Sequence, residues 1–115
     1  MTVQGQPQYS EAVKEVGEHS TREALDELSS VLAHCDDPRL IREFLQSILT
    51  ANEVKEIATR WALVRLIDLG MSQRSIAREL GLSLCKITRG SKELKKRNSA
   101  FRQMVDSYKG IVRSA

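Results

Sequence analysis

The stretch SQRSIARELGLSLCKITRGS, residues 72–91, decides the fold that we predict for this chain. Ser72 is placed to cap a short helix over 73–80, because its hydroxyl can accept from a free amide at a helix start. Gly81 ends that helix, since the turn needs a positive φ that glycine adopts at little cost. A second short helix follows and ends near Leu94. This arrangement is typical of a helix-turn-helix, which we place from about Ser72 to Leu94.

The apolar residues of this stretch support the same interpretation. Ser83 can cap the second helix, over 84–94. Ala77 stands where the two helices cross, and a larger side chain there would push them apart. A small core between the helices is predicted from Ile76, Leu80, Leu82 and Ile87. The alternative is two ordinary amphipathic helices joined by a glycine turn; the basic residues around the stretch favour a DNA-binding unit.

The segments on both sides are predicted to be helical as well, because apolar residues recur there at helical spacing. The start signals are capping boxes at Ser20–Glu23 and Thr50–Glu53 and the pair Asp37-Pro38. The further helices are predicted over 20–35, 38–48 and 51–69, with Gly70 as a left-handed end, and a last one begins at Asn98 or Ser99. The predicted class is all-α.

Composition bounds the domain organisation. The chain has 115 residues, of which 41% are hydrophobic and 4% aromatic, so one domain with an aliphatic core is expected. Because a domain of this size buries a limited share of its surface, association with a second chain would add stability. The polar residues 1–18 are predicted to form a flexible N-terminal arm, and residues 19–115 a single helical domain.

Charge is unevenly distributed along the chain. Residues 1–50 carry four basic and nine acidic side chains, whereas residues 51–97 carry eleven basic and five acidic ones. A basic segment in a nearly neutral protein can bind a polyanion such as nucleic acid. It can equally be a solvated helical face, and charge alone does not choose between the two.

Several classes of protein are disfavoured. No apolar run approaches the roughly 18 residues that span a membrane, and no signal-peptide order is present, so a cytoplasmic protein without membrane contact is expected. Cys35 and Cys85 are far apart, and His19 and His34 have no ligand cluster around them, so we expect no metal site and no disulfide. No catalytic constellation is recognisable, and an enzyme is not expected.

The second helix of the unit is predicted to read base edges in the major groove with its first residues. The candidates for base contacts are Leu84, Cys85, Lys86 and Thr88. Apolar side chains can meet thymine methyl groups, and lysine or threonine can hydrogen-bond to bases or phosphates. The candidates for contacts with the sugar-phosphate backbone of the DNA are Gln73, Arg74, Arg78 and Lys95.

The run from Leu49 to Lys95 resembles the tryptophan repressor family. The residues that carry the resemblance are Leu49-Thr50, Glu53, Thr59-Arg60, Met71 to Arg74, Glu79 to Gly81, ITRGS at 87–91, and Leu94-Lys95. The resemblance implies an intertwined homodimer of six-helix chains with a helix-turn-helix reading head. It also implies a transcriptional repressor on near-palindromic double-stranded operator DNA, with L-tryptophan as corepressor and no other cofactor.

The resemblance further implies a set of ligand-binding residues. The residues at the matching positions are Ser47, Leu49, Thr50, Arg60, Arg89, Gly90 and Glu93. Arg60 and Arg89 would flank the indole ring, Arg89 would pair with the ligand carboxylate, and Gly90 would leave room for the ring. Arginine suits this role because it stacks on aromatic faces and forms a fork with a carboxylate.

The chain departs from the family pattern at places that concern the ligand. Glu93 stands where the family usually has a small hydroxyl residue near the ligand ammonium, and Trp61 replaces a smaller aliphatic residue. One residue is missing between Gly70 and Met71, which shortens the hinge into the reading head. A carboxylate at position 93 can strengthen binding of an amine or repel the ligand carboxylate.

Two other functions stay open at this point. One is a ligand-independent DNA-binding module, similar to the origin-binding domain of replication initiators, which would not use Arg60, Arg89 and Gly90 as a pocket. The other is a helical interaction or dimerisation domain, in which the basic segment serves solubility. Steep salt dependence of DNA binding would count against the interaction domain.

Overall fold

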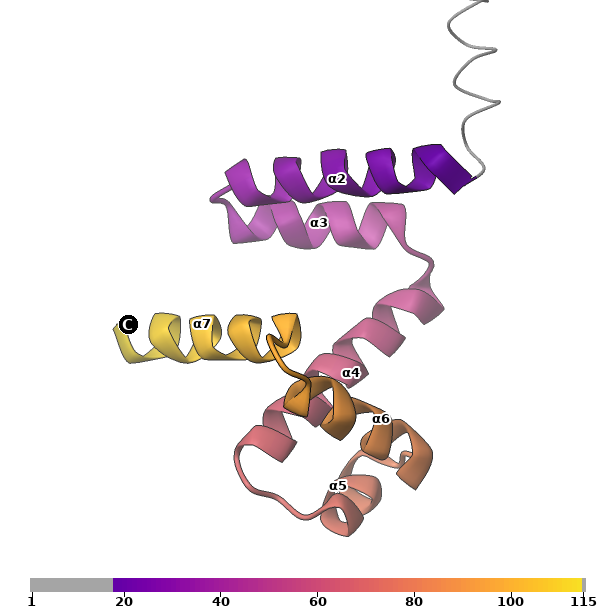
Figure 1. Cartoon of the computed structure of the whole chain (residues 1–115), viewed down its shortest axis with the longest axis vertical. Coiled ribbons are helices and arrows are strands. Elements are labelled where there is room, and N and C mark those ends of the chain that lie inside the picture. Colours follow the sequence, from indigo (N-terminus) through magenta and orange to yellow (C-terminus); the bar gives the residue numbers. More distant parts are fainter. Residues whose placement is uncertain (1–17, 115) are drawn as a thin grey trace, which may run out of the picture. The chain divides into compact units, whose positions relative to one another are not determined.

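The computed structural model of the chain describes residues 18–114 (Figure 1). The helices are α2 Glu18–His34, α3 Pro38–Ile48, α4 Ala51–Asp68, α5 Gln73–Leu80, α6 Leu84–Lys95 and α7 Ala100–Ser114. Within this part of the chain there are six helices and no strand, which confirms the predicted all-α class. The arm predicted over residues 1–18 lies outside the described residues, except for Glu18, which is helical.

The helices form two compact units that divide between Ile48 and Leu49. The first unit contains α2 and α3, which run in opposite directions (Figure 1). Asp37 Oδ1 accepts from the Arg39 amide at 3.0 Å, so the predicted Asp-Pro start of α3 is confirmed. Of the side chains described in this unit none is buried, and the exposed apolar ones include Leu25, Val31, Leu40 and Ile48.

The second unit contains α4 to α7 and has the core. Helix α6 packs against each of the other three helices. The buried side chains are Leu63 and Val64 of α4, Ile76 of α5, Ile87 and Leu94 of α6, and Val105 of α7. Because full burial of one such aliphatic side chain contributes about 1.5–3 kcal/mol, this cluster fixes α5 and α6 on α4.

The ends of α4 follow the predicted signals. The hydroxyl of Thr50 accepts from the Glu53 amide at 3.1 Å, and the Thr50 amide donates to Glu53 Oε1 at 2.8 Å, which confirms the capping box. At the other end Gly70 has a φ of 94°, and the Met71 amide donates to the Leu66 carbonyl at 3.1 Å. This left-handed end directs the chain into α5.

Two predicted helix starts need correction. Helix α2 is already helical at Glu18, so Ser20 lies inside it, and the prediction that the Ser20–Glu23 box begins the helix is wrong. Helix α7 begins at Ala100, one residue after the later of the two predicted starts, and the hydroxyl of Ser99 caps it by accepting from the Arg102 amide at 3.0 Å. The other boundaries lie within one residue of the predicted ones.

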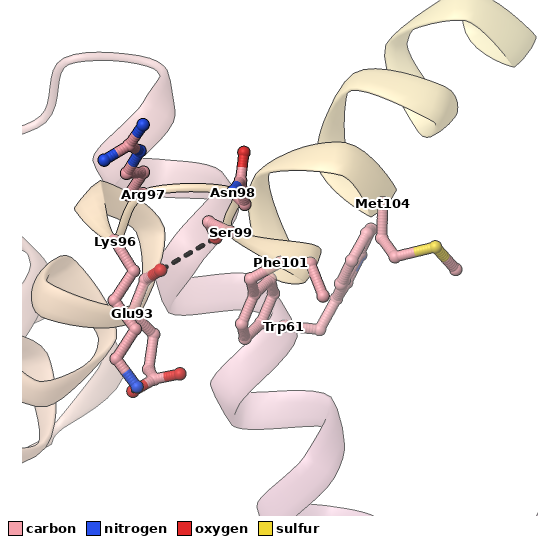
Figure 2. Close-up of a pocket in the computed structure, with 9 residues that line it drawn as sticks. Trp61, Glu93, Lys96, Arg97, Asn98, Ser99, Phe101 and Met104 are labelled. Atoms are coloured by element: carbon pink, nitrogen blue, oxygen red, sulfur yellow. Dashed lines mark hydrogen bonds and ion pairs between the residues drawn. The ribbon is translucent and has the colours of Figure 1, made fainter.

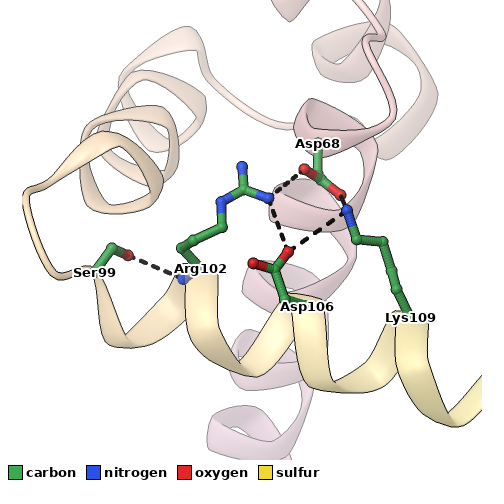
Figure 3. A network of polar contacts seen from close by, with 5 residues as sticks. All are labelled: Asp68, Ser99, Arg102, Asp106 and Lys109. Carbon is green, nitrogen blue, oxygen red and sulfur yellow. Dashed lines mark hydrogen bonds and ion pairs between the residues drawn. The ribbon is translucent and has the colours of Figure 1, made fainter.

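A network of ion pairs joins the end of α4 to α7 (Figure 3). The carboxylate of Asp68, whose side chain is 8% exposed, accepts from Arg102 at 2.6 Å and from Lys109 at 2.9 Å. On the more exposed side, Asp106 accepts from Arg102 at 3.2 Å and forms an ion pair with Lys109 at 3.6 Å. The hydrogen bonds from Lys109 and then Arg102 hold the pKa of Asp68 below its ordinary value.

Replacing Asp68 with asparagine is expected to lower the free energy of unfolding by about 1–3 kcal/mol at neutral pH, because two partly exposed cations lose a buried carboxylate. The lowered folded-state pKa means that the stabilisation is complete above the unfolded-state pKa and is lost as pH falls through the folded-state value. The difference from wild type should therefore shrink below about pH 4. Urea denaturation at several pH values measures it. Asp106→Asn is the matched control, and equal losses at neutral pH from both variants would contradict the assignment to Asp68.

Candidate functional site

Helices α5 and α6 form a helix-turn-helix with the predicted local signals. The hydroxyls of Ser72 and Ser83 cap the two helices, accepting from the Ser75 amide at 3.2 Å and the Lys86 amide at 3.4 Å. Gly81 has a φ of 64°, and the next amide, of Leu82, donates to the carbonyl of Ala77. A residue with a Cβ would be strained at that φ, so the tight turn depends on glycine.

The inner face of the unit is apolar. Ile76 and Ile87 are fully buried, and Ala77, Leu80 and Leu82 pack against the same cluster. The small core predicted between the helices is therefore confirmed. This core sets the rotation of α6 about its own axis. Because Ile87 is turned inward, the residues on either side of it are directed outward.

The outer face carries all the side chains predicted to contact DNA, and every one of them is exposed. They are Gln73, Arg74 and Arg78 on α5 and Leu84, Cys85, Lys86, Thr88 and Lys95 on α6. Leu84, the first residue of α6, is 51% exposed although it is apolar. The Thr88 hydroxyl donates to Gln73 Oε1 at 3.5 Å, which links the two helices on this face. The surface thus combines cations, hydrogen-bonding groups and one apolar contact at a helix start.

The residues predicted to bind the ligand belong to both units of the chain. Ser47 belongs to the first unit, where its hydroxyl donates to the Glu43 carbonyl, and the hydroxyl and amide of Thr50 take part in the capping box. Leu49 lies between them and is half-buried. Arg60 is exposed on α4, 3.9 Å from Glu56 one turn earlier.

Gly90 has a packing role that the sequence did not indicate. A Cβ built there would lie 2.7 Å from Cδ1 of Leu63 and 3.4 Å from Cγ2 of Val64. Both side chains are buried, so a shift of either one would disturb the core around it. Glycine at this position therefore allows α6 to lie close against α4; that it also leaves room for an indole ring stays a prediction.

Replacing Gly90 with alanine is expected to lower the free energy of unfolding by about 0.5–2 kcal/mol, because the overpacking of the added methyl against Leu63 exceeds the gain in helix propensity. Gly110→Ala is the matched control, since Gly110 is also helical and a Cβ there meets nothing within 4 Å. That variant should gain about 0.5–1 kcal/mol from helix propensity. Chemical denaturation of both measures the difference, and a stabilised Gly90→Ala protein would contradict the close crossing.

A cavity of about 470 Å³ lies beside the end of α6 and the start of α7 (Figure 2). Its lining is Trp61, Glu93, Lys96, Arg97, Asn98, Ser99, Ala100, Phe101 and Met104. Trp61 and Phe101 stack with ring centroids 5.9 Å apart. Of the predicted ligand residues only Glu93 lines this cavity. Lys96 and Phe101 could not be predicted at such a site, because the contact between α4 and α7 depends on tertiary packing.

Residues 18–114 show two further negative findings. No described helix has the length and apolar character that crossing a membrane requires. Within the same part of the chain no three His, Cys, Asp or Glu side chains are grouped as metal ligands would be. Cys35 and Cys85 are both free thiols.

Comparison with known proteins agrees with this geometry. The family model described as Trp repressor protein matches residues 23–109. A Trp operon repressor homolog of Xylella fastidiosa (strain M23) is 32% identical over 80 residues, covering 69% of this chain and 87% of that protein. A Trp operon repressor homolog of Haemophilus influenzae (strain PittEE) is 36% identical over 72 residues, which cover 62% of this chain and 71% of that protein. One of Chlamydia trachomatis serovar L2 is 31% identical over 68 residues, covering 58% and 72%.

No solved structure matches the chain. The family match includes the whole helix-turn-helix, all of α3 and α4, and α2 from residue 23 onward. The relatives carry the name of the same family, and they match this chain over 80 and 72 residues. The chain belongs to the Trp repressor family.

Proposed function

We propose that this protein is a dimeric, DNA-binding transcriptional repressor whose affinity for its operator responds to L-tryptophan. The observation that carries the proposal is the α5–α6 unit, whose outer face exposes all the predicted DNA contacts, in a chain of the Trp repressor family. The relatives are named Trp operon repressor homologs, which supports repression as the activity.

The proposed DNA contact follows from the shape of the unit. The first turn of α6 enters the major groove, where Leu84 meets a thymine methyl group and Lys86 binds a base or phosphate. Arg74 and Arg78 of α5 hold the phosphate backbone. The excess of basic side chains in residues 51–97 gives the long-range attraction and a salt-dependent affinity.

The proposed dimer is supported by exposed apolar side chains. The first unit buries none of its described residues, so α2 and α3 need a further surface to cover Leu25, Val31 and Leu40. Helix α7 likewise exposes apolar side chains, of which the largest are Met104, Tyr108, Ile111 and Val112. An intertwined homodimer would cover both sets and would make residues 19–115 one domain. Two-fold symmetry then calls for a near-palindromic operator.

The proposed ligand shifts the population of orientations of the helix-turn-helix toward the one that fits two successive major grooves. Arg89 and Glu93 are one turn apart on α6, so their side chains share a face that offers a cation and an anion to an amino acid. In this proposal Arg60, Arg89, Gly90 and Glu93 contact the ligand from the second unit. Leu49 and Thr50 of the same unit and Ser47 of the first unit stay further ligand contacts that the family resemblance predicts.

A second candidate is a DNA-binding module that needs no ligand. Two observations favour it. Gly90 is already needed for the close packing of α6 against α4, and Glu93 is the one predicted ligand residue that lines the cavity beside α6. Calorimetric titration of the full chain with L-tryptophan separates the two. The proposed function expects saturable binding that Arg89→Leu abolishes. Absence of binding to the wild-type protein would favour the ligand-independent module.

A further inference from the structure

The hydroxyl of Ser75 in α5 accepts two hydrogen bonds within the helix-turn-helix. The hydroxyl of Ser72, which caps α5, donates to Ser75 Oγ at 2.9 Å. Arg78 Nη2, three residues further along α5, donates to the same oxygen at 3.3 Å. Ser75 is half-buried and Arg78 is exposed. Ser75 is not among the side chains predicted to contact DNA, but it is bonded to one that is.

The position of Ser75 Oγ is fixed by its neighbours. The Ser75 amide donates to Ser72 Oγ at 3.2 Å, so two hydrogen bonds join these residues at the start of α5. The next residue, Ile76, has no exposed surface and belongs to the core of the second unit. Because the oxygen is held in this way, the guanidinium that bonds to it is oriented relative to that core.

The acceptor that holds Arg78 is neutral. Arg60 and Lys96 each form an ion pair with a carboxylate close by on the chain. Among residues 18–114, Arg78 has no such carboxylate partner. A carboxylate would orient the guanidinium but would also offset its charge, whereas a hydroxyl orients it and leaves the charge whole. That charge is what binds a phosphate of DNA.

We propose that Ser75 is a positioning residue, which holds the Arg78 guanidinium in the orientation in which it meets a phosphate of the DNA. A long exposed side chain loses conformational freedom when it binds, and a side chain that is already oriented loses less. Ser75 thereby raises the affinity of α5 for DNA without touching the DNA. The inference deepens the proposed function and rests on it for the contact between α5 and the phosphate backbone.

Arg74 provides a comparison within the same helix. It is exposed, lies one turn before Arg78, and is also predicted to contact the DNA backbone. Among the described residues it has no hydrogen bond to Ser75. If Ser75 only stabilises the start of α5, its loss weakens the contacts of both arginines alike. If it positions Arg78, its loss matters only while Arg78 is present.

The test is a pair of double-mutant cycles on the full chain, which cancel any effect of Ser75→Ala that is the same in every background. Affinity is measured by fluorescence anisotropy with L-tryptophan present, on a labelled duplex carrying a site selected from a random pool. Arg78→Ala is expected to weaken binding about three- to tenfold and to lower the log–log salt slope by about one. Ser75→Ala should weaken binding about two- to fivefold in the wild-type and Arg74→Ala backgrounds, but less than about 1.5-fold in Arg78→Ala. Ser75→Thr keeps the hydroxyl and should stay within about 1.5-fold of wild type.

The outcomes separate this inference from the proposed function. An equal loss from Ser75→Ala in all three backgrounds would assign Ser75 to the helix start alone, and would overturn the inference while DNA binding by α5 and α6 stands. Wild-type affinity in Arg78→Ala, or a loss in Ser75→Thr as large as in Ser75→Ala, would do the same. If the wild-type protein selects and binds no duplex, the inference and the proposed function are both overturned.

Discussion

Replacing Ile87 with alanine is expected to lower the free energy of unfolding by about 2–4 kcal/mol. Ile87 has no exposed surface and lies in the one cluster that joins α4, α5, α6 and α7. Its truncation removes apolar burial and leaves a cavity between α5 and α6 that the rigid turn at Gly81 cannot close. Urea denaturation at a fixed protein concentration measures the loss.

Cys85→Ala is the matched control for this prediction. Cys85 lies on the same helix two residues earlier, but its side chain is exposed on the outer face. That variant should change the free energy of unfolding by less than about 0.5 kcal/mol. Similar losses from both variants would show that α6 is not oriented by the core as described.

Reversing the charge of Lys86 with Lys86→Glu is expected to weaken DNA binding about 10- to 100-fold at low salt. Lys86 is exposed in the first turn of α6, where a cation can bind a phosphate or a base edge and a carboxylate would be repelled. Loss of one phosphate contact also lowers the steepness of the salt dependence by about one unit in the log–log slope. Fluorescence anisotropy with labelled duplex at several salt concentrations measures both effects.

The control is Arg113→Glu, which reverses a charge in the last turn of α7, outside the helix-turn-helix. Its affinity should stay within about threefold of wild type, the change expected from net charge alone. A loss as large as that of Lys86→Glu would mean that DNA binds through general positive charge rather than through the start of α6.

The helix-turn-helix could be predicted from sequence because its determinants are local. Ser72 and Ser83 each cap a helix within three residues, and Gly81 sets the turn through its own φ. The inward face needed only helical periodicity. Such signals do not depend on the rest of the fold, and the predicted bounds of α5 agree with the structure.

The features that the sequence did not reveal depend on contacts between distant residues. Asp68 bonds to Arg102 and Lys109, which are 34 and 41 positions away, and no spacing rule pairs them. The sequence predicts that Gly90 leaves space for a ligand, but it does not show that a Cβ there would also lie 2.7 Å from Cδ1 of Leu63 in α4. A glycine within a helix indicates a close approach without indicating what approaches.

The most direct test of the central claim is selection from a random pool of duplex DNA by the full-length protein, with and without L-tryptophan. A dimeric reader that responds to L-tryptophan should enrich a near-palindromic site, with half-sites about one helical turn apart, and should do so far more strongly when L-tryptophan is present. A pool that remains unenriched in both conditions would contradict DNA reading by α5 and α6. Equal enrichment with and without L-tryptophan would contradict the corepressor.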